Sequence, residues 1–319
     1  MRIFVTGASG WIGSAVVPEL IDAGHEVVAL ARSDASAAAL SGVGALVERG
    51  DLDDLEALGE AAAASDGVIH LAFKHELAFG GDFMGAASAD RRAVEAMGQA
   101  LLGSDRPFVV ASGILGISPG ALATERDGHD LDANRSRFGE GPLARWATSE
   151  FVLSLSEQAV RSAIVRLPPT NHGDGDNGFM ATLVTIARDS GIAGYIGDGS
   201  NRWPAVHRSD SARLFRLAVE ESAPGSTWHA VADEGVAIRD IAEVLGRHLD
   251  VPLVSVAPDD AAAHFTWLAN FLALDSPASS EETRRLLGWE PSGPGLLFDL
   301  DAGHYFSKPT THTAEAMTP

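Results

Sequence analysis

The chain contains no cysteine and is nearly devoid of lysine and tyrosine. The absence of Cys from its 319 residues excludes a thiol nucleophile, a disulfide framework and a Cys-ligated zinc. The two lysines are Lys74 and Lys308, and the two tyrosines are Tyr195 and Tyr305. The residues four positions after the tyrosines are Gly199 and Pro309. Any mechanism that needs Tyr four residues before Lys is therefore excluded.

Positive charge is also scarce. The 23 Lys and Arg residues face 44 Asp and Glu residues, for a net charge of −21, so nucleic acid and anionic membrane surfaces are not expected as partners. No apolar run reaches the ~18 residues of a membrane helix. We read no signal peptide at the N-terminus, so we predict a cytoplasmic protein. The eleven His show no H-E-x-x-H spacing, and no metal site is predicted.

The first half of the chain alternates short apolar strands with amphipathic helices. The strands are predicted over Arg2–Thr6, Glu26–Ala31, Ala45–Glu48, Gly67–Leu71, Phe108–Ala111 and Ser162–Arg166. The helices between them are predicted over Trp11–Ala23, Ala35–Leu40, Leu52–Ala64, Ala86–Leu102 and Leu143–Gln158. Such alternation indicates the α/β class, with a doubly wound, Rossmann-type parallel sheet covered on both faces.

After Pro168 the alternation loosens. Helices are predicted over Phe179–Asp189, Asp210–Glu220, Ile238–Leu249, Asp259–Leu272 and Ser280–Leu287, with a strand over Trp228–Ala232. We predict a dinucleotide-binding domain over residues 1–170, to which residues 205–235 return. A smaller, mostly helical substrate-binding region is expected over residues 171–204 and 236–306, followed by a loosely held tail over 307–319.

A glycine-rich loop joins the first strand to the first helix. It contains Thr6, Gly7, Ser9, Gly10, Trp11, Ile12 and Gly13. The three glycines allow a tight turn, close approach of the backbone to a pyrophosphate, and close packing of helix on strand. The helix N-terminus then offers free N–H groups and partial positive charge to the phosphates. The loop therefore predicts dinucleotide binding.

The end of the second strand indicates which dinucleotide is bound. An NAD site has Asp or Glu there to accept a hydrogen bond from the ribose 2′-hydroxyl. This chain has Arg32 and Ser33 instead, and Arg binds phosphate well. NADP(H) is therefore predicted over NAD(H), although Asp34 is a counter-signal, since a shifted loop could bring it to the ribose.

These motifs resemble the extended and atypical short-chain dehydrogenase/reductases, the group that contains the NAD-dependent epimerase/dehydratases. The resemblance covers nearly the whole chain and is closest to an atypical, NADP-dependent epimerase-like subgroup. It implies adenine contacts at Asp51 and Leu52, and backbone contacts to the cofactor at Leu71, Ala72 and Phe73. It also implies a catalytic role for Ser112 at the end of the fifth strand and nicotinamide contacts at Pro168 and Thr170. A homodimer is one assembly that the resemblance suggests.

The chain departs from this family at its proton donor. The family's Tyr and Lys would fall at Pro142 and Trp146, and neither side chain can transfer the proton. Arg145 is one residue away; a guanidinium stays charged and is a poor acid, but it could stabilise an oxyanion or hold a substrate anion.

Several residues are candidates for the missing function. Imidazole can donate a proton near neutral pH, so His172 is the first candidate acid, although a polar or structural His is the commoner role. The other expected substrate-side residues are Lys74, His75, Tyr195, Trp203 and His207. For Lys74, a solvated surface lysine is the alternative.

Together these features predict an NADP(H)-dependent oxidoreductase that reduces a carbonyl or imine of a small molecule by hydride transfer. Two alternatives remain. One is an NADP(H)-binding regulatory or sensor protein without turnover, which the missing Tyr and Lys would explain. The other is a sugar-nucleotide-type epimerase, which would need a competent base in both directions.

Overall fold

The computed structural model describes residues 1–131 and 140–307. Its main feature is a seven-stranded parallel sheet in the order β10-β6-β5-β4-β1-β2-β3. The strands are β1 (Arg2–Thr6), β2 (Glu26–Ala31), β3 (Leu46–Arg49), β4 (Gly67–His70), β5 (Pro107–Gly113), β6 (Arg161–Leu167) and β10 (Ser226–His229). The strand order reverses between β1 and β4, which is where a doubly wound sheet binds its ligand.

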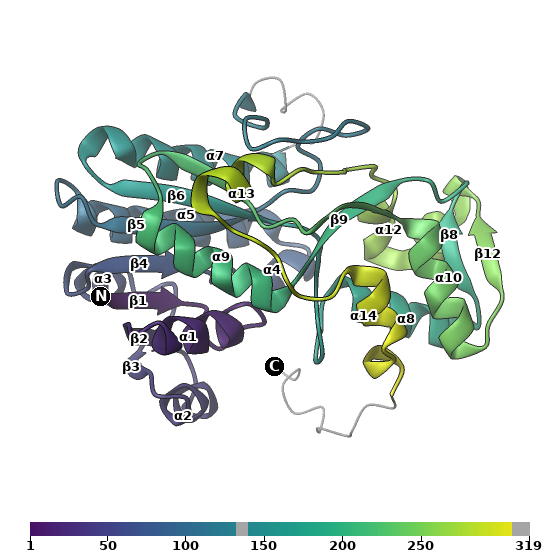
Figure 1. The fold of residues 1–319 in the computed structure, drawn as a ribbon, viewed down its shortest axis with the longest axis horizontal. Helices are drawn as coiled ribbons and strands as arrows, with labels where there is room; N and C mark the ends of the chain where they lie inside the picture. Colours follow the sequence, from purple (N-terminus) through teal and green to yellow (C-terminus); the bar gives the residue numbers. More distant parts are fainter. Residues whose placement is uncertain (132–139, 308–319) are drawn as a thin grey trace.

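Helices cover both faces of this sheet (Figure 1). One face carries α1 (Gly13–Asp22) and α9 (Arg208–Glu221), whose apolar residues share a core with β1 and β2. The other carries α3 (Leu55–Ala63), α5 (Phe83–Leu101) and α7 (Glu140–Ser154) around Val94, Met97 and Val152. The short helix α2 (Asp34–Gly42) follows β2. The predicted α/β class and Rossmann-type sheet are therefore confirmed.

The C-terminal region has a separate hydrophobic core. Its helices are α8 (Phe179–Ser190), α10 (Ile238–Leu249), α11 (Ala261–Phe265), α12 (Ala269–Leu272) and α14 (Leu296–Asp301). Its strands form the order β11-β9-β7 from Asp233–Ala237, Arg202–His207 and Thr170–His172, and the order β12-β8 from Leu253–Val256 and Ala193–Ile196. Figure 1 shows β8, β12 and α10 at the end of the molecule away from β1–β3. This core is distinct from the clusters on the two faces of the main sheet.

The chain returns to the main sheet after β9. Helix α9 packs on α1, and β10 pairs with β6 at the edge of the sheet. Helix α13 (Glu281–Leu287) lies beside this edge, and Thr283 Oγ1 accepts a hydrogen bond from His229 N. The segment after β9 therefore belongs to the main sheet in space.

The predicted helix over Asp259–Leu272 is wrong as a single element. The structure divides it into a 3-10 turn (Pro258–Asp260), α11, a second 3-10 turn (Thr266–Leu268) and α12. Thr266 has φ of 53°, a conformation that a β-branched residue rarely adopts and that no α-helix can contain. The break turns Trp267 toward the surface, where it is 41% exposed.

Within the described residues, every helix is too short or too polar to cross a membrane.

Candidate functional site

The glycine-rich loop after β1 packs closely against the backbone that follows β4. Gly7 has φ of +66°, and a Cβ there would lie 2.6 Å from Ala72 N. A Cβ on Gly13 would lie 2.1 Å from Gly7 O, so both positions require glycine. Helix α1 begins at Gly13, and no described side chain caps its N-terminus at Ile12. The first amide groups of α1 are therefore well placed to bind the pyrophosphate of a dinucleotide.

Trp11 connects this loop to β7. Its Nε1 donates a hydrogen bond to Asn171 O at 2.7 Å. The Arg208 guanidinium lies over the indole, 4.3 Å from its centroid. The residues that follow β6 are thus fixed beside the loop. The predicted cofactor contacts, Pro168 and Thr170, belong to this segment. Pro168 is buried, and Thr170 Oγ1 donates to Pro204 O.

A second arginine lies beside the predicted ribose end. Arg32 and Ser33 are exposed after β2. Arg49, the last residue of β3, is opposite Ala31 in the register and donates to Ser33 O and to Asp34 at 2.8 Å. Asp34, the sequence signal against NADP, is therefore paired with a cation. Arg49 could not be predicted from the sequence, because its position depends on the pairing of β2 with β3.

Lys74 faces the predicted adenine end. Its Nζ donates to Asp53 Oδ2 at 2.5 Å, and this hydrogen bond lowers the pKa of Asp53. Asp51 Oδ1 accepts from Asp53 N at 2.7 Å, and Leu52 is buried. The lysine thus joins the segment after β4 to the turn after β3, and this contact does not favour its predicted substrate-side role.

A buried polar chain lies beneath the loop. Thr6 Oγ1 is 2.7 Å from His70 Nδ1, and His70 Nε2 is 3.2 Å from Asp90 Oδ1 on α5. Burial would raise the pKa of Asp90, but the His70 hydrogen bond and the charge of Arg145 hold it below its usual value. Asp90 is therefore an anion between His70 and Arg145. The His70–Asp90 pair could not be predicted from the sequence, because Asp90 comes from the middle of a helix.

Two residues of α7, Ser149 and Arg145, bind the carboxyl end of β5 at Ser112 and at Ala111 O. Ser112 Oγ is 2.9 Å from Ser149 Oγ of α7, and both serines are buried. Arg145 Nη2 donates to Ala111 O at 3.1 Å, and its guanidinium lies 3.9 Å from the Phe73 ring centroid. The Arg145 charge is thus held against Phe73, the ring that follows β4, and against the carbonyl of Ala111, the residue before Ser112.

The positions of the family's Tyr and Lys both fall in α7. Trp146 is buried among Ile114, Leu143 and Val231. Pro142 is in the first turn of the helix. Of the chain's two lysines, Lys74 is engaged with Asp53, and Lys308 lies outside the described residues.

The candidate acid His172 and the predicted substrate-side residues of the C-terminal region are mostly enclosed. His172 is fully buried, with Nδ1 2.8 Å from Asp299 Oδ2, and burial lowers its pKa. Its ring is edge-on to His207, whose Nδ1 is 2.7 Å from Ser209 Oγ at the start of α9. Tyr195 and Trp203 belong to the C-terminal core. An imidazole with no exposed surface is poorly placed to protonate a substrate, so the structure favours a structural His172.

A buried arginine anchors the segment that follows β5. Arg166 on β6 donates to Asp127 O at 2.7 Å and contacts His229 Nε2 at 3.3 Å. Because the guanidinium can only donate, His229 Nε2 accepts and Nδ1 donates to Ser279 O. Burial lowers the pKa of Arg166 to about 10 and, together with the Arg166 charge, that of His229 to about 3. At neutral pH the pair is a charged arginine bound to a neutral histidine.

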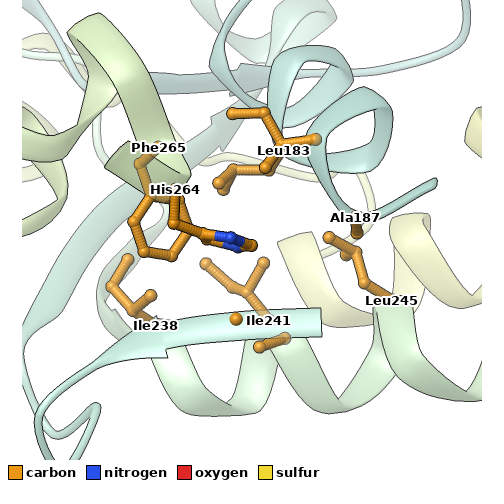
Figure 2. Close-up of a pocket in the computed structure, with 10 residues that line it drawn as sticks. Leu183, Ala187, Ile238, Ile241, Leu245, His264 and Phe265 are labelled. Atoms are coloured by element: carbon orange, nitrogen blue, oxygen red, sulfur yellow. The ribbon is translucent and has the colours of Figure 1, made fainter. Parts of the chain in front are cut away.

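Two hollows lie away from these residues. Figure 2 shows the first, a cavity of about 10 Å³ inside the C-terminal core, with His264 pointing among aliphatic side chains. That volume is about enough for one water, so a substrate does not fit. The second, of about 460 Å³, is an open groove beside β10 that is lined by His129, Arg126 and Leu286. Neither contains Ser112 or Arg145.

Among the described residues, no three His, Asp or Glu side chains come together as a metal site.

Comparison with known proteins identifies the family. Residues 3–230 match the NAD dependent epimerase/dehydratase family. A Saccharomyces cerevisiae protein, named only as uncharacterized YLL056C, is 45% identical over 306 residues, which are 95% of this chain and 99% of that protein. The 2-alkyl-3-oxoalkanoate reductase of Stenotrophomonas maltophilia is 29% identical over 239 residues, which are 71% of this chain and 67% of the reductase.

The fold is shared with solved structures of similar size. The UDP-glucose 4-epimerase of Thermotoga maritima, solved with UDP-glucose, superposes with a TM-score of 0.71. It is 17% identical, and the alignment covers 96% of this chain and 98% of the epimerase. At this identity the likeness shows the fold alone.

Proposed function

This chain belongs to the NAD-dependent epimerase/dehydratase family, and we propose that it reduces a carbonyl or imine of a small molecule with NADPH. The observation that carries the proposal is a pair of groups at the carboxyl end of β5: the Ser112 hydroxyl, and the Arg145 guanidinium that binds the carbonyl of the preceding residue, Ala111. One is a hydroxyl at the position of the family's Ser, and the other is a fixed cation beside it. The reductase among the relatives gives further support.

The two side chains have separate roles in this proposal. The Ser112 and Ser149 hydroxyls are 2.9 Å apart, and either can donate to the other, while Ser149 Oγ also lies 3.3 Å from Arg145 O. When Ser149 donates to Ser112, the Ser112 hydroxyl is free to donate to the carbonyl oxygen of the substrate. Arg145 uses one N–H on Ala111 O and rests on Phe73. Its charge stabilises the negative oxygen that develops during reduction.

When bound, NADPH supplies the hydride, which goes to the carbonyl carbon. The oxygen takes a proton from water, because the guanidinium stays charged and His172 is fully buried. The products are an alcohol and NADP⁺. Ser112 and Arg145 therefore polarise and stabilise the oxygen while the solvent replaces the missing tyrosine as proton source.

Arg32 and Arg49 support NADP(H) as the preferred cofactor. Arg32 is exposed beside Ser33 and lies 3.9 Å from Glu76, while Arg49 donates to Ser33 O and to Asp34. Both ion pairs are exposed, so a 2′-phosphate could replace the two carboxylates and meet both guanidinium groups.

The test is NADPH consumption with a panel of aldehydes, ketones and imines. We expect turnover by the wild type and a loss of about 10²-fold in kcat for Ser112→Ala, with NADPH affinity unchanged. Tight NADPH binding with no consumption against the whole panel would contradict the proposal.

That opposite result would favour a second function, in which the chain binds NADP(H) without turnover. The buried Trp146 at the position of the family's Lys is the observation that supports it. Such a protein would report the reduced or oxidised state of the cofactor to a partner.

A further inference from the structure

A row of aromatic rings leads from the Ser112 end of β5 to the C-terminal region. It begins at Phe73, which carries Arg145 on its face. His75 of α4 (His75–Phe79) lies 5.1 Å from Phe73 and stacks on Phe79 at 5.8 Å. Phe79 then contacts Trp267 at 4.8 Å. The row joins the main sheet to the C-terminal region. Figure 1 shows α4 on the side of the sheet that faces this region.

The last two rings of the row form an exposed platform. Phe79 is 47% exposed and Trp267 is 41% exposed, although they touch each other. Behind Trp267, Phe179 and Phe271 pack at 5.5 and 6.0 Å. The platform is thus supported from within and open outward. Adjoining exposed aromatic side chains of this size indicate a binding surface.

The charges near the platform do not suit a nucleotide sugar, whose diphosphate needs cations. Among the described arginines of the C-terminal region, most are already engaged. Arg202, Arg239, Arg247 and Arg285 pair with carboxylates, and Arg284 donates to Ser280 and to backbone carbonyls. Arg188 is in the last turn of α8, about 14 Å along the helix from Phe179 in the first turn. The net charge of −21 also repels anions.

We propose that the Phe79–Trp267 platform binds the flat, apolar part of an uncharged substrate, an aromatic ring or a conjugated chain that carries the reacting carbonyl. Flat rings stack or meet edge to face with such side chains. The proposal rests on the proposed function for the place of the carbonyl, which is at Ser112. It adds the substrate class, a neutral aromatic or conjugated aldehyde or ketone.

Binding is tested separately from turnover, with full-length protein and NADP⁺. The probes are cinnamyl alcohol and the same alcohol with a cyclohexyl ring in place of phenyl, which has the same number of carbons but is not flat. We expect Phe79→Ala and Trp267→Ala each to weaken cinnamyl alcohol binding about tenfold. The cyclohexyl alcohol should bind more weakly and respond less. Leu77→Ala is the matched control, since Leu77 is 39% exposed on the same helix and outside the row.

Kinetics complete the test with cinnamaldehyde, its cyclohexyl counterpart and UDP-glucose. We expect the fall in kcat/KM to follow the fall in binding. Equal affinity for the two alcohols, unchanged affinity in both variants, or a preference for UDP-glucose would overturn the proposal. Oligomeric state gives one more contradicting outcome. If Trp267→Ala converted a dimer into a monomer and left alcohol binding unchanged, the platform would be a contact between two copies of the chain and not a substrate site. Ring-dependent binding without NADPH consumption would instead contradict only the proposed function.

Discussion

The Arg145 guanidinium lies over the Phe73 ring, with its Cζ 3.9 Å from the ring centroid, while its Nη2 donates to Ala111 O. Stacking and a hydrogen bond together fix a long side chain that would otherwise sample many rotamers. The charge is thus positioned before any substrate arrives. Asp90 is near enough to respond to this charge through a lowered pKa.

Arg145→Ala should lower kcat for carbonyl reduction by about 10²-fold, because it removes a preorganised charge from the developing oxyanion. Arg145→Lys should recover only part of the rate, since an ammonium cannot match the planar stacking of a guanidinium on Phe73. Arg188→Ala, which changes an arginine far along α8, is the matched control. Full activity in Arg145→Ala would exclude the residue from the reaction.

Ser149→Ala should lower kcat by about tenfold, less than Ser112→Ala, because it removes only the partner that orients the Ser112 hydroxyl. Steady-state kinetics with saturating NADPH measure both variants. An effect of Ser149→Ala on KM alone would show that the hydroxyl pair binds substrate without assisting the chemistry.

Arg32→Ala and Arg49→Ala should each raise the Kd for NADP⁺ by about tenfold or more, because each removes a cation from the 2′-phosphate. The Kd for NAD⁺ should change less than about twofold. Arg2→Ala is a suitable control, since Arg2 pairs with Glu26 at the opposite end of the strands. Titration calorimetry measures the affinity of each variant for NADP⁺ and for NAD⁺. Equal losses of affinity for the two cofactors would contradict the assignment of Arg32 and Arg49 to the 2′-phosphate.

The free energy of unfolding should fall as the pH drops from 6.5 toward 3, partly because of His229. Burial and the Arg166 charge lower the pKa of His229 from 6.5 to about 3. In that window the unfolded chain binds a proton that the folded chain excludes, so acid favours unfolding. His229→Gln should show a shallower dependence on pH than the wild type in urea denaturation. The control is His248→Gln, and identical slopes for wild type and His229→Gln would refute the assignment.

The sequence predicted the parts of the molecule that depend on local pattern. Apolar strands that alternate with helices indicated the parallel sheet, and Gly7, Gly10 and Gly13 indicated the loop between β1 and α1. The resemblance to the short-chain dehydrogenase/reductases singled out Ser112 at the end of the fifth strand, and Ser112 lies there in β5. The sheet and the loop are set by residues close together in the chain, so periodicity and turn chemistry were enough.

The rest depends on contacts between distant segments. Arg49 reaches Ser33 only through the register of β2 with β3. His172 is a structural residue in the present interpretation because Asp299, far along the chain, binds it in the core. The break at Thr266, which exposes Trp267 beside Phe79, requires a positive φ that no residue pattern indicated.

The most direct measurement uses NADPH deuterated at the transferring carbon of the nicotinamide ring. After incubation with the enzyme and cinnamaldehyde, mass spectrometry of the cinnamyl alcohol shows where the label went. We predict one deuterium on the carbinol carbon for each NADPH consumed, formed much more slowly by Ser112→Ala and Arg145→Ala. Binding of NADPH without consumption or labelled alcohol, with cinnamaldehyde and across the wider carbonyl panel, would contradict hydride transfer by this chain.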